Sequence, residues 1–215
     1  MPDTPRSWAG QSRRPEPRAH TLAHVMNSSP GDVPAEFRRA LASLRATRLR
    51  PEVHLEEVPG PGRIAPFTVA LAAEVTAAPA EDELASGRFV VLHDPAGQEA
   101  WDGTFRLVTL VRAKLEVDLG ADDLLAEVAW TWLDDALADA GVVPHATGGT
   151  VTRVLSRSFG ALGHRPAEAE IEIRASWTAL EADLGPHLQA WAGLLCQAAG
   201  LPPLPRAVRD PRPQR

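Results

Sequence analysis

Residues 104–117 have the sequence TFRLVTLVRAKLEV, and whether they form a strand or a helix decides the fold. The stretch is rich in β-branched residues, and apolar or small residues alternate from Phe105 to Leu115, which favours a strand. A helix is the alternative, because Phe105, Val108 and Arg112 recur at helical spacing. We favour the strand, and this choice places four consecutive strands in the first half of the chain.

Five further segments are predicted as strands, from alternating apolar residues or, in one case, from a continuous apolar run. They cover residues 53–57, 67–75, 88–92, 150–159 and 170–178. The run at 88–92 is typical of a strand that is covered on both faces, and Pro95 and Gly97 are expected to end it. Residues 77–87 are predicted to form an acidic loop and Gly148-Gly149 a turn.

Three amphipathic helices are predicted from apolar residues at helical spacing. The first begins near Val33, where Asp32 can cap it, and the last covers residues 184–199. The second follows Asp122 and ends at Gly141. Its predicted apolar stripe comprises Leu124, Leu125, Val128, Trp132, Leu133 and Leu137. This order of elements predicts an α+β fold: a single domain with a largely antiparallel sheet of about six strands and three main helices packed on one face.

The length and composition fit one globular domain with extended ends. The chain has 215 residues, of which 44% are hydrophobic, and this is enough for a sizeable core. We expect the domain to cover residues 32–203, between a disordered extension at 1–31 and a disordered basic tail at 204–215. Translation from Met26 is an alternative to translation from Met1.

Charge is unevenly distributed along the chain. Residues 1–25 carry a net charge of +2 and residues 206–215 one of +3, so with a total of −6 the remainder carries −11. An acidic body repels phosphate backbones, which disfavours nucleic-acid binding by the body. Weak contacts between the basic ends and nucleic acid are the alternative.

The cysteine content and the absence of long apolar runs predict a cytoplasmic protein. Cys196 is the single cysteine, which excludes a disulfide within the chain and a thiolate zinc site. Its apolar helical surroundings predict a buried, inert thiol. No apolar run approaches the ~18 residues of a membrane span, so no membrane partner is expected.

Polar and aromatic residues are dense between the third and fourth predicted strands, in His93-Asp94-Pro95-Ala96-Gly97 and from Trp101 to Arg106. His93 and Asp94 could form a general acid and base pair in which the carboxylate orients the imidazole. The alternative is a turn in which Asp94 accepts backbone N–H bonds. We favour the turn, because adjacent strand residues point to opposite faces. A metal centre is disfavoured because the other histidines lack ligand spacing, and no cofactor is expected.

Arginines on the predicted strands form a second candidate site. Three strands each carry two charged residues on one face: Arg106 with Arg112, Arg153 with Arg157, and Glu172 with Arg174. If these faces meet in a cleft, the guanidinium groups could bind phosphate or carboxylate in a bidentate manner. The alternative is a solvated sheet face with cross-strand pairs between arginine and glutamate.

The tryptophans divide into two groups. Trp132, Trp177 and Trp191 are expected in the core, because they lie on apolar stripes. Trp101 and Trp130 are candidates for stacking on a ligand or anchoring a partner, with core packing as the alternative.

Four segments resemble an uncharacterised actinobacterial family called domain of unknown function three thousand. They are LHDPAG at 92–97, WDGTFRLVTLVR at 101–112, IEIRASWT at 171–178 and LLCQAAGLPP at 194–203. The resemblance covers residues 33–203 and implies an actinobacterial origin and a single-domain cytoplasmic protein. It implies no activity, cofactor or catalytic residue.

We therefore expect a non-catalytic binding or adaptor module that engages a small anionic ligand or a protein partner. Its ligand-binding candidates are His93, Asp94, Trp101, Arg106, Arg153, Glu172 and Arg174. The alternative is an enzyme that acts on a small anionic metabolite, with His93 as acid or base and arginines holding the anion. That alternative requires His93, Arg106, Arg153 and Arg174 to converge on one concave pocket.

Overall fold

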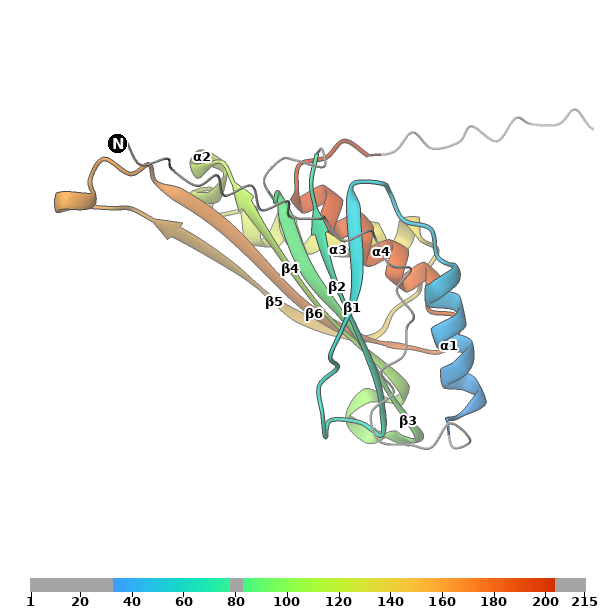
Figure 1. The fold of residues 1–215 in the computed structure, drawn as a ribbon. Coiled ribbons are helices and arrows are strands. Elements are labelled where there is room, and N and C mark those ends of the chain that lie inside the picture. Colours follow the sequence, from blue (N-terminus) through green and yellow to red (C-terminus); the bar gives the residue numbers. More distant parts are fainter. Residues whose placement is uncertain (1–32, 78–82, 204–215) are drawn as a thin grey trace, which may run out of the picture.

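The central strand β4 (Gly103–Leu115) confirms the strand that the sequence favoured over a helix at residues 104–117. Its residues alternate between buried ones, such as Leu107, and exposed ones, such as Arg112. One face of β4 therefore lies in the core, and the other faces outward. β4 pairs along most of its length with β3 on one side and β6 on the other (Figure 1).

The structure, a computed structural model, describes residues 33–77 and 83–203. Six strands form one sheet in the order β1-β2-β3-β4-β6-β5. Besides β4, the strands are β1 (Val53–Val58), β2 (Phe67–Val75), β3 (Ala85–Gln98), β5 (His145–Ser156) and β6 (Glu168–Ala179). Every pair of neighbours is antiparallel, so β1 and β5 are the two edges of the sheet. This is the α+β sheet that the order of elements predicted.

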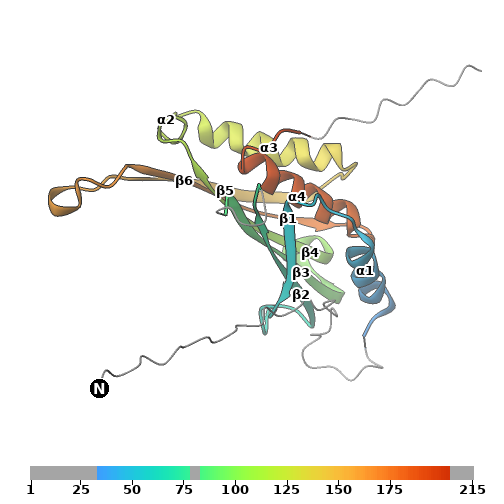
Figure 2. The ribbon, with the colours of Figure 1, turned by 45° about the horizontal axis from the view of Figure 1, so that its top comes forward.

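Helices cover one face of the sheet, and no helix of the described residues covers the other, which is called the open face here (Figure 2). The long helices are α1 (Ala35–Ala46), α3 (Leu125–Asp139) and α4 (Gly185–Ala198). A single-turn helix, α2 (Val117–Gly120), follows β4, and two short 3-10 helices, η1 (Glu99–Trp101) and η2 (Gly160–Leu162), lie in connections.

The core lies between the sheet and the three long helices. Trp177 of β6 and Trp191 of α4 are fully buried there, as the sequence predicted. Truncating a buried aromatic side chain of this kind to alanine costs about 3–5 kcal/mol, so both residues matter for holding α4 on the sheet. Cys196 is also buried, and burial raises the pKa of its thiol.

The core face of α3 differs from the predicted stripe. Its buried residues recur every four positions: Leu125, Ala129, Leu133 and Leu137. Leu124 and Val128 of the predicted stripe are instead 66% and 46% exposed, and Trp132 is only half-buried. Apolar residues occur on two sides of this helix, so periodicity alone did not distinguish them, and packing against α4 selected one side.

Two predicted loops are parts of strands. β3 begins at Ala85, inside the predicted loop 77–87, and Gly148-Gly149 lies within β5 and not in a turn. Small residues carry no apolar pattern, whereas the backbone groups of a strand pair without help from side chains, and this explains both errors. β3 also continues past Pro95, although its register with β4 shifts after His93.

Some predictions lie outside the described residues. These are the disordered ends at 1–31 and 204–215, the helix cap at Asp32 and the middle of the 77–87 loop. α1 begins at Ala35, slightly later than predicted. Within the described residues, no helix is both long enough and apolar enough to cross a membrane.

Candidate functional site

The first predicted site lies around Asp94 at the outer end of β3, where the register with β4 shifts after His93. The Asp94 carboxylate accepts hydrogen bonds from the Ala96 N–H at 3.0 Å and from the Gln98 side-chain amide at 3.2 Å. After η1, Asp102 adopts a left-handed conformation with a φ of 51°. Both Asp94 oxygens are therefore used locally, and one of them accepts a backbone N–H bond, as the favoured interpretation expected. The predicted turn itself is wrong, because residues 94–98 are an irregular end of β3.

His93 lies in the core and not in a cleft. Its ring is fully buried on the helix-covered face, 4.1 Å from the Phe105 ring and 5.7 Å from the Phe37 ring between centroids. Nδ1 lies 3.1 Å from the Thr104 carbonyl oxygen, and Nε2 has no hydrogen-bond partner among the described residues. Burial lowers the pKa of His93, which favours the neutral imidazole. In this position the side chain is not accessible to a substrate.

The two tryptophans that were candidates for ligand contact pack within the domain. Trp101 is buried, and its backbone carbonyl accepts a hydrogen bond from the Thr178 hydroxyl. Trp130 is half-buried on α3, and its ring lies close to the backbone of Gly149 in β5. Both rings are therefore engaged in packing.

Arg106 points to the open face, away from the side on which His93 is buried. Its guanidinium donates hydrogen bonds to the Ala146 carbonyl at 2.8 Å and to the hydroxyls of Ser176 and Thr178 at 2.7 and 3.1 Å. Partial burial lowers the pKa of Arg106. The residue therefore links β4 to β5 and β6, and much of its hydrogen-bonding capacity is already used.

Arg153 lies on the opposite face of the sheet from Arg106. It pairs with the core residue Ile171 in the register of β5 and β6, so it lies on the helix-covered side. Its guanidinium binds the Asp123 carboxylate at 3.1 Å and the Asp122 backbone carbonyl. The predicted cluster therefore does not converge on one pocket. Among the described residues, no three His, Cys, Asp or Glu side chains are grouped so that they could hold a metal.

The open face does bring Glu172 and Arg174 together. The Glu172 carboxylate of β6 pairs with Arg112 of β4 at 2.5 Å and with Arg174 at 2.7 Å. The two arginine side chains are 58% and 62% exposed. The Glu172 carboxylate itself is only 15% exposed, so the two arginines hold it in place while their own guanidinium groups stay accessible to solvent.

Arg88 is a site residue that sequence reasoning missed. It lies opposite Leu110 of β4, which in turn lies opposite Arg174 of β6, so the three residues form a row across the open face. Arg88 is exposed, and it has no ion-pair or hydrogen-bond partner among the described residues. The sequence could have indicated it, because Arg88 and Val90 are two residues apart on a strand and so lie on the same face. The continuous apolar run at 88–92 hid this alternation.

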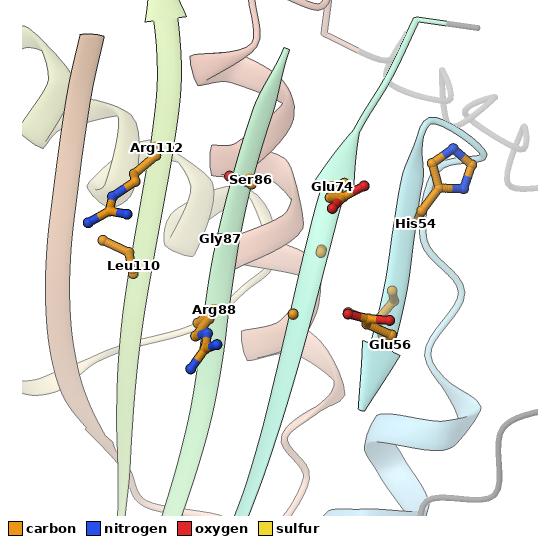
Figure 3. Close-up of a pocket in the computed structure, with 11 residues that line it drawn as sticks. His54, Glu56, Glu74, Ser86, Gly87, Arg88, Leu110 and Arg112 are labelled. Carbon is orange, nitrogen blue, oxygen red and sulfur yellow. The ribbon is translucent and has the colours of Figure 1, made fainter. Parts of the chain in front are cut away.

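Two adjoining hollows lie on the open face and share Arg88 and Leu110. The first, of about 420 Å³, extends from β1 to β4. Figure 3 shows Arg88 and Arg112 on one side of it and His54, Glu56 and Glu74 on the other. The open face is therefore basic over β3 and β4 and acidic over β1 and β2.

The second hollow, of about 330 Å³, extends from β3 across β4 and β6 to β5 and is lined mostly by apolar atoms. Val90 and Val108 contribute to this apolar lining, and Arg88 and Arg174 also border the hollow. Gly148 of β5 lies there too, and a Cβ added to it would meet no heavy atom within 4 Å. The volume is in the range of small-ligand sites.

A family model described as a protein of unknown function, DUF3000, matches residues 33–208. The match includes every helix and strand of the described structure. No curated protein and no solved structure matches the chain.

Proposed function

The chain belongs to the DUF3000 family of proteins of unknown function, and from this premise we propose that it is a non-catalytic binding module for a small anionic ligand. The ligand carries a carboxylate or phosphate group on an apolar body, and it occupies the second hollow of the open face. One observation carries the proposal: an exposed cation without a protein partner among the described residues, Arg88, borders an apolar hollow.

The apolar lining supports a ligand with a hydrophobic body. Val108 is 40% exposed although its neighbours on the other face of β4 are buried, so apolar surface faces water in the hollow. Removing apolar surface from water is worth roughly 25 cal/mol per Å², which favours a ligand that covers Val90 and Val108. Gly148 keeps this side of the hollow open because it has no side chain.

The charges around the hollow support an anionic group on the ligand. Arg112 and Arg174 share one carboxylate, that of Glu172, and Arg88 has none among the described residues, so positive charge is in excess. A guanidinium group binds carboxylate or phosphate with two parallel hydrogen bonds. The acidic residues over β1 and β2, Glu56 among them, repel an anion, so they orient the anionic group toward Arg88 and Arg174.

No catalysis is proposed, because the second hollow offers no acid or base. Its lining, within the described part of the chain, contains no His, Asp, Glu, Lys or Cys side chain. The hydroxyl of Ser176 in that lining accepts a hydrogen bond from Arg106. His93, the acid or base of the enzyme hypothesis, is buried on the other face of the sheet.

The compartment and the class of ligand are proposed from two separate observations. The cytoplasm is the proposed compartment, because Cys196 is a buried free thiol and the described residues contain no disulfide. Nucleic acid is not proposed as the ligand of the open face, because Glu56, Glu74 and Glu172 would repel a phosphate backbone.

A ligand screen by thermal shift tests the proposal. The test compounds are acids with an apolar body. Each has two matched controls: the neutral amide of the same body, which lacks the charge, and a small acid such as acetate, which lacks the apolar body. A ligand at a hundred times its Kd stabilises the folded state by about 2.7 kcal/mol. We expect the apolar acids to raise the melting temperature and both kinds of matched compound to have little effect.

Three variants locate the site. Arg88→Gln removes the cation, and Gly148→Leu is designed to fill the hollow from a position where an added Cβ meets no heavy atom within 4 Å. Both variants are expected to abolish the shift. Lys114→Gln is the matched control, since Lys114 is an exposed cation of β4 that lines neither hollow. A shift that survives both site variants, or that Lys114→Gln removes, would show that the ligand binds elsewhere.

A further inference from the structure

The outer part of the β5–β6 hairpin projects from the body of the molecule (Figures 1 and 2). Its connecting residues 157–167 are called the hairpin tip here. Backbone hydrogen bonds such as that from the Leu162 N–H to the Phe159 carbonyl stay within the tip. Phe159 is 76% exposed and Leu162 46%. Large apolar side chains on a projecting hairpin indicate a surface that contacts another molecule.

A second group of exposed apolar side chains lies on α2 and at the start of α3. Leu119 is 44% exposed, Leu124 66% and Val128 46%. Leu124 and Val128 are four residues apart, so they lie on the same side of α3. Together with the acidic residues of 116–139, they are called the α2–α3 surface here. Leu124 and Val128 belong to the predicted stripe of the second helix, but the core does not use them.

The two surfaces carry opposite charges. Residues 116–139 contain eight acidic residues, all of them exposed, and no lysine or arginine. The hairpin tip contains Arg157 and Arg165, both exposed, and no acidic residue. Each surface therefore combines exposed apolar groups with one sign of charge, and the charge of one complements that of the other.

The tip does not lie on the α2–α3 surface of its own chain, because in both views it projects beyond α2 and α3 (Figures 1 and 2). A second copy of the chain can bring its α2–α3 surface to this tip. We propose that the chain forms a symmetric dimer in which the hairpin tip of each copy packs on the α2–α3 surface of the other. A two-fold axis makes the two contacts equivalent, so all four exposed patches are covered at once.

Charge reversal on each side tests the dimer. One variant carries Arg157→Glu and Arg165→Glu in the tip. The other carries Glu127→Lys and Asp135→Lys. Glu127 lies three residues after Leu124, and Asp135 lies seven residues after Val128, so both are on the same side of α3 as these apolar residues. Placing like charges opposite each other costs several kcal/mol, so we expect each variant to raise the dimer dissociation constant by about a hundredfold. Sedimentation equilibrium of the full-length chain measures this constant.

Mixing the two variants distinguishes the loss of this interface from the loss of the fold. In the mixed pair, the acidic tip meets the basic α3, and the unchanged tip meets the unchanged α3. An equimolar mixture should therefore form heterodimers although neither variant dimerises alone. Variants that had simply lost their fold would not recover in this way.

A control variant with the same net charge change as the tip variant carries Arg38→Glu and Arg48→Glu, both exposed and distant in sequence from the two surfaces. It should dimerise like the unchanged chain. Monomers at every protein concentration in low salt would overturn the proposal. A dimer that charge reversal leaves intact, or a mixture that stays monomeric, would overturn it as well. If only a different protein binds the tip, the unchanged chain sediments as a monomer and the proposal is wrong.

Discussion

His187 of α4 is buried with its ring against Trp177, and the two side chains share one hydrogen bond. The Trp177 Nε1–H donates to Nδ1 of His187 at 2.9 Å, so this nitrogen must stay unprotonated. Burial lowers the pKa of His187 from its ordinary 6.5 to about 4. The packing of α4 on β6 therefore depends on a neutral imidazole.

This histidine predicts a loss of stability in mild acid. Between pH 6.5 and 4 the unfolded chain binds a proton at His187 and the folded chain does not, so the free energy of unfolding falls as pH falls. The loss amounts to about 3 kcal/mol at the acid end and vanishes above the ordinary pKa. Urea unfolding across this range measures it.

His187→Asn is the matched comparison, because the Asn side-chain oxygen can accept the Trp177 hydrogen bond but does not titrate. Its stability should change much less over the same pH interval. An equally steep pH dependence in this variant would assign the effect to other groups.

His93 is the second buried histidine, and its Nε2 has no hydrogen-bond partner among the described residues. We predict that His93→Phe changes the free energy of unfolding by no more than about 1 kcal/mol, because an aromatic ring still fills the site. His93→Ala should cost about 2–4 kcal/mol, because it leaves a cavity between Phe105 and Phe37. Denaturant titration of both variants measures the difference.

The same pair of variants bears on the site. Ligand binding on the open face should be unchanged in His93→Phe, since His93 lies on the covered face. A folded His93→Phe protein that no longer binds the ligand would restore a functional role for this imidazole.

The edge strand β5 contains two adjacent glycines with opposite surroundings. A Cβ on Gly149 would lie 2.1 Å from the Arg174 carbonyl oxygen and 2.7 Å from the Trp130 ring, whereas one on Gly148 would meet nothing within 4 Å. Adjacent strand residues face opposite sides, so Gly149 lies toward α3 and Gly148 on the open face. The absence of a side chain at Gly149 is what lets α3 pack closely on β5.

We therefore predict that Gly149→Ala destabilises the protein by about 1–3 kcal/mol, as overpacking does. Gly148→Ala should change the stability by less than about 1 kcal/mol, and in the stabilising direction, because it restricts the unfolded chain. Thermal unfolding of the two variants side by side tests the pair. Equal effects would mean that β5 does not lie beneath α3 in this register.

The molecule as a whole consists of a body and a projecting hairpin tip. Every residue of 157–167 is exposed or half-buried, and Ser156 lies opposite Glu168 where the paired part of the hairpin ends. We predict that replacing 157–167 by Asn-Gly, which suits a two-residue hairpin turn, leaves the body folded. Circular dichroism and the melting temperature of the dilute protein should change little.

The same replacement should remove the concentration dependence of the melting temperature. A dimer is stabilised by mass action, so the melting temperature of the unchanged chain should rise with protein concentration, and that of the shortened chain should stay constant. Differential scanning calorimetry over a range of concentrations measures both. A shortened chain that does not fold would show that the tip belongs to the body.

Local pattern determined much of this protein. Alternation of apolar residues predicted β2 at its observed bounds of Phe67–Val75 and decided that residues 104–117 contain a strand. The spacing of Leu188, Trp191 and Leu195 predicted the core face of α4. These elements were predictable because each has one apolar side. In α4 the apolar side extends over several helical turns and in the strands over several alternate residues, and it is the apolar side that is buried.

The tertiary structure decided which residues share a surface. Period-two alternation assigns residues to opposite faces of a strand but does not say which face the helices cover. The sequence alone therefore did not show that His93 lies in the core and Arg88 on the surface. Arg153 and Arg174 were expected together, yet the register of β5 with β6 places them on opposite faces. Register and the choice of covered face depend on contacts between segments distant in sequence, and no local pattern contains those contacts.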